Sequence, residues 1–539
     1  MKKIIFLLLL NLLLFSCARV GAPNGGTRDS LAPKFLGSNI DTTRLNVSRT
    51  VKELRLDFDE YVMLKDFNKN FNVSPPIKKI KKVIPSNLAN KYVLIQWEDT
   101  LQANTTYNFN FGNAIVDNNE SNPLPYFNFA FSTGDKIDDL FVSGTVKDAM
   151  TLIKENQTAK DNKMVVGLYK AGENLDYKQK PDYITKVDEE NYFELNFLPK
   201  GEFVIIAFDD ENQNSVYDAG KEKVSFLKEK ITLDSTSVRG LKLKLYPSKK
   251  VVKYKESKAI NGGLLMTFEG NPETVDVKSL SEDLKDFKVT HAKRSDSVNI
   301  WFDAEKSNLG GTVSKQVKLS YFTPTISDTI SVSYKAVKEE FKLSNEAGNL
   351  IAPENNFVIN TSLPIENLKT SSWKLESDSI AQDFTAKISE KNPFKILVNS
   401  SFKPTKKYVL TIPKETVSSY YSSNDKSFQF QFEIDKPENY GSFTAVIKNK
   451  PTAKFWVELT NEKGEILYSQ FTNASEVSFK NLKPATYIAR IRVDNNGNGF
   501  WDEADFAQNI AAEDVYIFEK EINVRPLWEI KEDWELTNH

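Results

Sequence analysis

Short stretches in which apolar and polar residues alternate recur along the chain, and this pattern constrains the fold more than any other. In residues 51–58, VKELRLDF, the apolar side chains of Leu54, Leu56 and Phe58 alternate with polar ones, which is typical of a strand with one buried face. Similar stretches follow at residues 92–97, 106–111 and 126–131. Turn-forming Asn, Pro and Gly residues separate them. The sequence therefore predicts an all-β protein built from sandwiches of short strands.

A chain of 539 residues requires several such units, because a single hydrophobic core stops growing well below this length. A first internal repeat relates two units across 301 positions without a gap. The inward-facing positions stay apolar in both copies, as a shared core pattern requires. The matched residues are Val93, Ile95, Trp97, Tyr107, Phe127, Phe129 and Phe131 with Phe394, Ile396, Val398, Tyr408, Phe428, Phe430 and Phe432. A fainter rhythm of the same kind across residues 250–345 predicts another unit.

A second repeat relates residues 198–218 to residues 482–502 across 284 positions. Four of its five identities are Asp or Asn residues. The identical pairs are Leu198 with Leu482, Asp210 with Asp494, Asn212 with Asn496, Asn214 with Asn498 and Asp218 with Asp502. Strand-like stretches at 142–149 and 443–450 begin both copies, so we expect two units of a second kind.

These units resemble known families of β-sandwich. The segment from LDFDEYVMLKDF to YFNFAFSTGD resembles the SbsA-type bacterial Ig-like domain, and the regions around the second repeat resemble prealbumin-like modules of the carboxypeptidase-regulatory and Cna-B kinds. In enzymes that have them, such modules are appended and non-catalytic. The resemblance implies tandem Ig-like and prealbumin-like β-sandwiches in an elongated array. Its expected parts are an SbsA-type Ig-like domain (32–136), a prealbumin-like sandwich (138–248), two Ig-like sandwiches (249–345 and 346–437), a second prealbumin-like sandwich (438–525) and a C-terminal tail (526–539).

The N-terminus has the features of a secreted lipoprotein. Lys2 and Lys3 precede an apolar run, residues 4–15, that is too short to span a bilayer but has the length of a secretory signal. The run ends in LLFSC, which resembles the lipobox of bacterial lipoproteins. This implies a signal peptide at 1–16 and a linker at 17–31 that begins with lipidated Cys17. Because Cys17 is the only cysteine, the chain cannot form an internal disulfide. The alternative is an ordinary or uncleaved signal with a spare cysteine.

The same segment bears on localisation. The start of the chain resembles lipoproteins of Bacteroidota-type bacteria that carry bacterial Ig-like modules, which implies attachment to the outer membrane through the N-terminal lipid. In that group, export to the cell surface is often associated with acidic residues just after the lipidated cysteine. No acidic residue follows Cys17 closely, which favours the periplasmic face.

The loop at residues 493–506, VDNNGNGFWDEADF, offers oxygen ligands for a hard cation. Ca²⁺ takes about six to eight oxygens, and loop positions 1, 3, 5, 7, 9 and 12 can face one centre when a small residue stands at position 6. Counted from Asp494, Gly499 takes the sixth position. The predicted ligands are then Asp494, Asn496, Asn498, the Phe500 carbonyl, Asp502 and Asp505.

The first copy of this loop is a weaker candidate. Its ligands would be Asp210, Asn212, Asn214, the Val216 carbonyl and Asp218. However, Ser215 replaces the glycine, and Lys221 stands at the twelfth position. A structural Ca²⁺ site is one interpretation of both loops. The other is that Asp and Asn close a tight turn by capping their own backbone.

Few residues of this chain suit catalysis. Its histidines are His291 and His539, so a Ser-His-Asp or Cys-His site lacks its parts. The adjacent carboxylates Asp59 and Glu60 could in principle serve a glycosidase. The 71 Lys and Arg residues nearly balance the 73 Asp and Glu residues, which gives no overall field that would attract nucleic acid.

These features favour a non-enzymatic, lipid-anchored cell-envelope protein that acts as a β-sandwich spacer and binding scaffold. An accessory subunit of an outer-membrane protein assembly or secretion complex is a second interpretation, and a cell-envelope glycan hydrolase is a third. The expected partners are other outer-membrane proteins or envelope glycan. Trp528 and Trp534 lie beyond the last expected strand and are predicted partner contacts.

Overall fold

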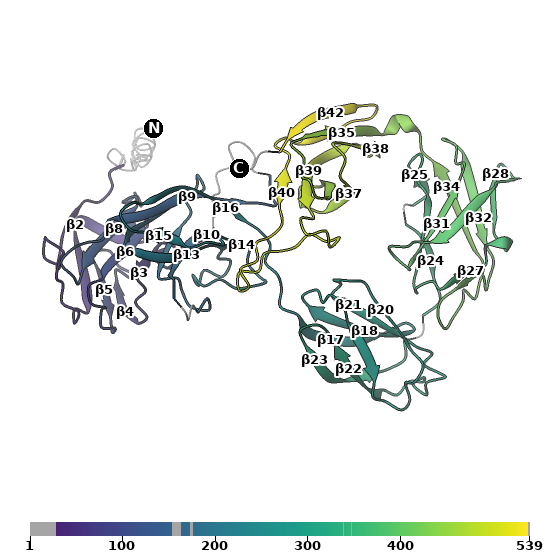
Figure 1. Ribbon diagram of the computed structural model, residues 1–539, viewed down its shortest axis with the longest axis horizontal. Helices are drawn as coiled ribbons and strands as arrows, with labels where there is room; N and C mark the ends of the chain where they lie inside the picture. The colour runs from purple at the N-terminus through teal and green to yellow at the C-terminus, as the bar shows by residue number, and fades with distance from the viewer. Residues whose placement is uncertain (1–28, 153–162, 173–175, 338, 347, 537–539) are drawn as a thin grey trace, which may run out of the picture.

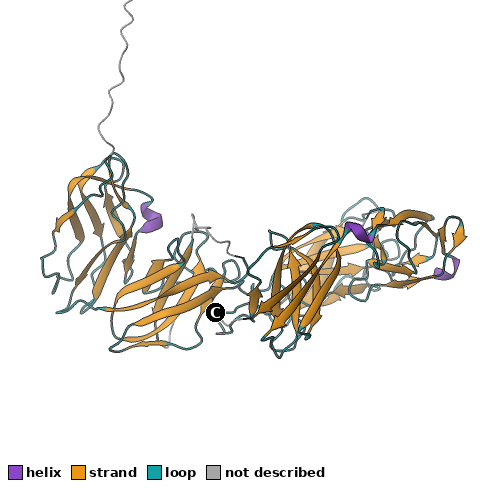
Figure 2. Ribbon diagram, turned by 90° about the horizontal axis from the view of Figure 1, so that it is seen from above, coloured by secondary structure: helices purple, strands orange, loops and turns teal. Residues whose placement is uncertain are grey.

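The computed structural model describes residues 29–536 apart from 153–162, 173–175, 338 and 347, and these residues are almost entirely β-structure. Within them, helix is limited to α2 (Phe67–Asn70) and two 3-10 turns, η1 (Thr370–Ser372) and η2 (Pro437–Asn439). Five hydrophobic cores follow one another along the chain. The prediction of an all-β, tandem array of β-sandwiches is confirmed (Figure 2).

The predicted signal peptide and Cys17 lie outside the described residues. In the part of the chain that the structure does describe, no helix is long and apolar enough to cross a membrane.

The first sandwich buries a core rich in phenylalanine between two sheets. The rings of Phe109 and Phe131 stack in it with centroids 5.8 Å apart. Leu54, Leu56 and Phe58 are buried, as their alternation predicts. One sheet has the order β1-β2-β5-β4 with β7 on β2, and the other has the order β3-β6-β8. The strands are β1 (Phe35–Ser38), β2 (Glu53–Leu64), β3 (Asn72–Ser74), β4 (Ile80–Ile84), β5 (Asn90–Trp97), β6 (Thr106–Gly112), β7 (Ile115–Asp117) and β8 (Phe127–Ser132).

The second sandwich packs a five-stranded sheet on a three-stranded one. The larger sheet has the order β11-β10-β13-β14 with β15 on β13, and the smaller has the order β12-β9-β16. Strand β16 runs parallel to β9. The strands are β9 (Leu140–Asp148), β10 (Met164–Lys170), β11 (Tyr183–Lys186), β12 (Tyr192–Leu198), β13 (Gly201–Asp209), β14 (Val224–Phe226), β15 (Ile231–Leu233) and β16 (Val238–Leu245).

The third sandwich is formed by the sheets β17-β18-β21-β20 and β19-β22-β23. Both sheets are antiparallel, and Met266 and Leu319 from opposite sheets are fully buried in the core between them. The strands are β17 (Lys253–Ile260), β18 (Gly263–Glu269), β19 (Asp276–Ser279), β20 (Lys288–His291), β21 (Ser297–Trp301), β22 (Lys315–Phe322) and β23 (Ser327–Tyr334).

The fourth sandwich repeats the strand order of the first. Its sheets are β24-β26-β31-β30 and β25-β34-β32-β28-β29, with a small extra sheet β27-β33. Tyr107 and Tyr408, matched by the first repeat, are both buried, and each hydroxyl accepts a hydrogen bond of 2.8 Å from the N–H five residues earlier. The strands are β24 (Leu343–Asn345), β25 (Leu350–Ile351), β26 (Phe357–Thr361), β27 (Asn367–Leu368), β28 (Lys374–Ser377), β29 (Ile380–Ala381), β30 (Phe384–Ile388), β31 (Lys395–Ser400), β32 (Lys407–Ile412), β33 (Val417–Ser418) and β34 (Phe428–Ile434).

The fifth sandwich has the topology of the second, which is the structural counterpart of the second repeat. Its sheets are β37-β36-β39-β40 with β41 on β39, and β38-β35-β42. Strand β42 runs parallel to β35, as β16 does to β9. The strands are β35 (Gly441–Lys448), β36 (Phe455–Thr460), β37 (Ile466–Thr472), β38 (Glu476–Leu482), β39 (Ala485–Val493), β40 (Val515–Ile517), β41 (Ile522–Val524) and β42 (Glu529–Glu535).

The prediction that residues 526–539 form a tail beyond the last strand is wrong, because Glu529–Glu535 form β42. Trp534 is 4% exposed and lies in the core, 5.3 Å from the ring of Phe518. It therefore cannot contact a partner as predicted. Glu532 occupies the inward-facing position between Ile530 and Trp534, which interrupts the alternation of apolar and polar residues in β42. The second sandwich could have predicted this strand, because its β16 lies 291 positions earlier and the buried Leu243 of β16 corresponds to Trp534.

The row of sandwiches is not open-ended. Figure 1 shows the third, fourth and fifth sandwiches arranged on a curve that brings the fifth back to the second. Direct contacts join neighbours along this path. They include Ile184 N–H to Ser74 Oγ at 3.2 Å, the rings of Trp301 and Phe394 at 6.0 Å, and Asn481 Nδ2 to the Pro353 carbonyl at 2.8 Å.

Candidate functional site

The Asx loop of the fifth sandwich follows β39, and its side chains converge on one another. The carboxylate of Asp494, a residue only 3% exposed, accepts hydrogen bonds from the N–H groups of Asn498 and Gly499, both at 3.0 Å. The side-chain amides of Asn496 and Asn498 donate to Oδ2 of Asp502 at 2.5 and 2.8 Å. Gly499 has a φ of 81°, a left-handed conformation that glycine adopts without strain. The structure therefore brings four of the predicted ligands together.

Phe500 and Asp505 are the other two predicted ligands, and only Phe500 is part of the loop. The Phe500 N–H donates to Oδ1 of Asn498 at 2.8 Å, so its backbone belongs to the loop. Asp505 does not join it, because its carboxylate accepts a hydrogen bond from the Gln508 N–H in the following turn. The carboxylate that closes the loop is that of Glu513.

Glu513 reaches the loop from just before β40. Its two oxygens accept hydrogen bonds from the N–H groups of Asn496 and Asp502, at 3.1 and 2.9 Å. Glu513 is only 6% exposed, and burial together with the nearby charge of Asp502 raises its pKa above the ordinary value. Burial acts in the same direction on Asp502, but hydrogen bonds from Asn496 and Arg294 outweigh it and lower the pKa of that carboxyl.

The loop of the second sandwich is built in the same way. Asp210 is buried and accepts hydrogen bonds from the N–H groups of Asn214 and Ser215, while Asn212 donates to Asp218 at 2.5 Å. The Val216 N–H donates to Asn214 Oδ1 at 2.6 Å. Here Glu222 closes the loop by accepting the N–H groups of Glu211 and Asp218, at 3.1 and 2.8 Å.

Glu222 is the most perturbed carboxyl of this loop. It is 2% exposed, and burial together with the charges of Asp210 and Asp218 raises its pKa to about 7, although hydrogen bonds from backbone N–H groups act in the opposite direction.

The role of Glu222 and Glu513 in closing the loops was not predicted from the sequence, although both residues lie shortly after the two copies of the second repeat. The two residues are 291 positions apart, whereas the loops themselves are 284 apart. The second copy thus carries a seven-residue insertion between Asp502 and Glu513. Extending the repeat beyond this insertion would have aligned the two glutamates and also β14 with β40.

The fit of these loops to Ca²⁺ can be judged from their geometry. Each clusters carboxylate and amide oxygens of the kind that Ca²⁺ prefers. However, both oxygens of Asp494 already accept backbone N–H groups, as the tight-turn interpretation expects. Among the residues described, no group of three or more His, Cys, Asp or Glu side chains is arranged to hold a metal ion. Structural Ca²⁺ in either loop stays a prediction.

The segment that holds this insertion, residues 503–512, projects from the Asx loop, and we call it the finger. Its Phe506 is 5% exposed and lies among aromatic rings of the second sandwich. The centroid of the Phe506 ring is 4.4 Å from that of Tyr177, 5.1 Å from that of Phe226 and 5.9 Å from that of Tyr217. Figure 1 shows this yellow segment reaching toward β14.

Backbone hydrogen bonds reinforce the contact made by the finger. The Lys249 N–H donates to the Ala504 carbonyl at 2.8 Å, and the Ala504 N–H donates to the Pro247 carbonyl at 3.1 Å. The side chain of Asn509 also donates to the Lys228 carbonyl. We call this whole contact between the second and fifth sandwiches the clasp.

The third sandwich contributes an arginine to the same region. Nη1 of Arg294 donates to Oδ1 of Asp502 at 2.7 Å, and the guanidinium lies over the ring of Phe500, 4.6 Å from its centroid. Arg294 also pairs with Glu273 of its own sandwich. Because both partners are only partly exposed, this ion pair is screened less than a surface pair. Three sandwiches therefore meet at the Asx loop of the fifth.

A buried charge network supports the base of this loop. Glu458 is fully buried and accepts two hydrogen bonds from Arg490 and two from Arg492. Arg492 also lies 5.8 Å from the ring centroids of Trp456 and Trp501. The two-sided pairing of Glu458 fixes the direction of Arg492, and Arg492 in turn contacts the loop through Trp501.

The remaining candidate residues lie away from the clasp. Trp528 is 49% exposed, with the guanidinium of Arg525 over its ring, so its predicted partner contact stays open. Asp59 accepts the Lys34 N–H at 2.8 Å, and burial and nearby acidic groups raise the pKa of Glu60. His291 Nε2 lies 3.1 Å from the Ser295 carbonyl, in the turn between β20 and β21.

Comparison with known proteins identifies one part of the chain. Residues 29–133 match the family model of a bacterial Ig-like domain. No curated protein matches the chain.

Comparison with solved structures gives several matches of low sequence identity. The S-layer protein SbsC is 12% identical, with 92% of this chain and 67% of that chain covered and a TM-score of 0.15. The Bacteroides ovatus protein SGBP-B, solved with a mixed-linkage heptasaccharide, is 9% identical, with 72% and 97% covered and a TM-score of 0.20. BcpA, the major pilin subunit of Bacillus cereus, is 12% identical, with 74% and 99% covered and a TM-score of 0.13.

Proposed function

We propose that the protein is a non-catalytic scaffold of the cell envelope, held at the periplasmic face of the outer membrane by lipid on Cys17. The observation that supports this most directly is the clasp. Sandwiches joined only by linkers move relative to one another by default, because contacts between domains are usually small and polar. The clasp instead combines a buried aromatic ring with paired backbone groups, and a partly buried ion pair from the third sandwich reinforces the same region.

A closed arrangement suits a scaffold that must present its surfaces at fixed positions. Binding a partner with a preorganised surface avoids the entropic cost of ordering mobile domains at that moment. The partner would be another outer-membrane protein or envelope glycan. The exposed Trp528 supports a protein partner, because exposed tryptophan and arginine side chains are common centres of protein interfaces.

Two experiments test this proposal. For the anchor, cells that express the wild-type chain or Cys17→Ser are fed radiolabelled palmitate. We expect label in the wild-type chain alone, and equal labelling of both would refute lipidation at Cys17.

For the scaffold, the tagged full chain is recovered from native membranes after mild crosslinking. The wild type, Phe506→Ala and Ile510→Ala are compared, since Ile510 lies on the same finger but is 47% exposed. We expect an outer-membrane β-barrel protein or an envelope glycan to copurify with the wild type and Ile510→Ala, and to be reduced with Phe506→Ala. Recovery that is the same for all three variants would show that the closed arrangement does not serve partner binding.

A further inference from the structure

A cavity of about 330 Å³ lies where the fourth and fifth sandwiches meet, near the start of β39, whereas the Asx loop of the fifth sandwich follows the end of that strand. Its volume is at the lower end of the range of about 300–1,000 Å³ that small-molecule sites occupy. Strands β37 and β38, which are edge strands of the two sheets of the fifth sandwich, form its long walls. A loop of the fourth sandwich, around Ala352 and Asn355, closes one end.

Two side-chain hydrogen bonds connect the walls of the cavity at its ends. At the end near the fourth sandwich, Asn481 donates its side-chain N–H to the Pro353 carbonyl at 2.8 Å. At the other end, Gln470 donates to the Ser478 carbonyl at 2.7 Å and so ties β37 to β38. These bonds fix the spacing of the walls and leave the amide oxygens of Asn481 and Gln470 available as acceptors.

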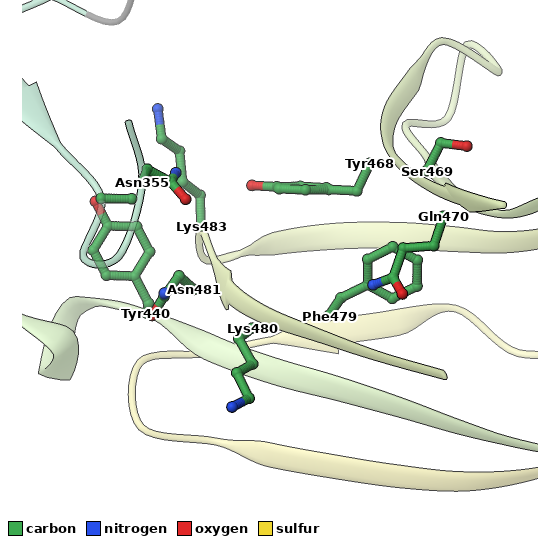
Figure 3. A pocket seen from close by; sticks show the side chains of 10 residues that line it. Asn355, Tyr440, Tyr468, Ser469, Gln470, Phe479, Lys480, Asn481 and Lys483 are labelled. Atoms are coloured by element: carbon green, nitrogen blue, oxygen red, sulfur yellow. The ribbon is translucent and has the colours of Figure 1, made fainter. Parts of the chain in front are cut away.

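An aromatic ring forms one face of the cavity. Figure 3 shows the ring of Tyr468 extended across it, with its hydroxyl directed toward the end where Asn355 and Lys483 lie. Tyr468 is partly exposed, and its ring meets the buried ring of Tyr487 edge to face with centroids 5.9 Å apart. A ring held in this way offers a fixed apolar face, against which the C–H groups of a sugar can pack.

The polar side chains that line the cavity are either neutral or basic. Among the residues that the structure describes, the side chains of Asn355, Ser469 and Lys483 form no hydrogen bond or ion pair, and all three are exposed. Lysines 480 and 483 both line the cavity, whereas none of its lining residues is acidic. A ligand with several hydroxyls would find donors and acceptors here, and a carboxylate at the end near Asn355 would find the ammonium group of Lys483, with no acidic residue in the lining.

We propose that this cavity binds a uronic-acid unit of an acidic glycan. The sugar ring would lie against Tyr468, its hydroxyls would bond to Asn355, Ser469 and the amide oxygens, and its carboxylate would face Lys483. This inference does not depend on the clasp or on the lipid anchor, so its failure would leave the scaffold proposal intact.

The test measures binding of defined disaccharides to the full chain in detergent by isothermal titration calorimetry. The probes are digalacturonate and the neutral galactobiose of the same linkage. We expect the wild type to bind digalacturonate more tightly than galactobiose, with a difference that shrinks as salt is raised. We expect Tyr468→Ala to weaken binding of digalacturonate by about tenfold, and Lys483→Gln to abolish the preference for the acidic disaccharide.

Two further variants separate binding from folding. Phe471→Ala is the matched control, because Phe471 is an exposed aromatic residue on the same strand that stacks on Trp456 and does not line the cavity. Asn355→Ala changes an exposed loop of the other sandwich and should weaken binding severalfold without affecting the fold. Equal binding by Tyr468→Ala and Phe471→Ala, no binding of either disaccharide, or tighter binding of the neutral one would each overturn the proposal.

Discussion

Replacing Phe506 with alanine should open the clasp without unfolding either sandwich. The ring is 5% exposed, and complete burial of a phenylalanine side chain is worth about 1.5–3 kcal/mol. Its contacts with the rings of Tyr177, Tyr217 and Phe226 add about 0.5–1.5 kcal/mol for each favourable pair. A loss of about 3 kcal/mol would shift the ratio of closed to open molecules by about a hundredfold.

The distance between the two sandwiches reports this equilibrium directly. Spin labels on cysteines introduced at Lys200 and Lys463, both exposed and both away from the clasp, would be measured by pulsed electron resonance in a Cys17→Ser background. We expect one narrow distance distribution for the parent chain and a broader one, extending to longer distances, for Phe506→Ala. The thermal unfolding of the fifth sandwich should not change, because Phe506 is not part of its core.

The matched control is Ile510→Ala, which alters the same finger at a position that is 47% exposed. This variant should keep the narrow distribution of the parent chain. If Phe506→Ala also keeps it, the buried ring does not hold the two sandwiches together and the reasoning about the clasp is refuted.

Three further predictions concern charged groups. Glu458→Ala should destabilise the fifth sandwich by about 3–5 kcal/mol in chemical unfolding, because it leaves the buried Arg490 without its counter-charge; a loss below about 1 kcal/mol would contradict this. The raised pKa of Glu222 means that the folded chain keeps a proton that the unfolded chain has released, so stability relative to Glu222→Gln should fall as the pH rises from about 4.5 to about 7; parallel melting curves across that window would disprove it. If the loop of the fifth sandwich binds Ca²⁺ with a Kd of about 10⁻³ M, 10 mM Ca²⁺ should stabilise the chain by about 1.4 kcal/mol. Asp494→Asn should abolish that gain and Asp505→Asn should not; a shift that is the same in both, or is matched by Mg²⁺, would count against the site.

Local pattern was enough to predict the strands and their buried faces. Leu54, Leu56 and Phe58 are buried because a strand alternates its side chains between two faces, and this rule needs no knowledge of the neighbouring strands. The same rule failed at β42, where Glu532 stands at the inward-facing position between Ile530 and Trp534 and only Trp534 is buried within the strand. Its place in the core is set by the parallel pairing with β35, which local alternation does not reveal.

The candidate site was predicted in part for a similar reason. Asp494, Asn496, Asn498 and Asp502 lie close in sequence, so the turn alone brings them together. Glu513 comes from beyond the insertion, and Arg294 comes from another sandwich. Their positions depend on how the sandwiches pack, and a repeat compared only up to the loop could not locate them.

The pairing of β42 with β35 has a consequence for the order in which the parts of the protein fold. The first strand of the fifth sandwich must wait for its parallel neighbour until everything between them has been synthesised. During that interval the second sandwich is already folded, but its rings Tyr177, Tyr217 and Phe226 stay uncovered. The finger, whose Phe506 packs against them, belongs to the sandwich that is still incomplete. Chaperones that shield exposed aromatic surface therefore have a defined moment, and a defined place on the growing chain, at which to act.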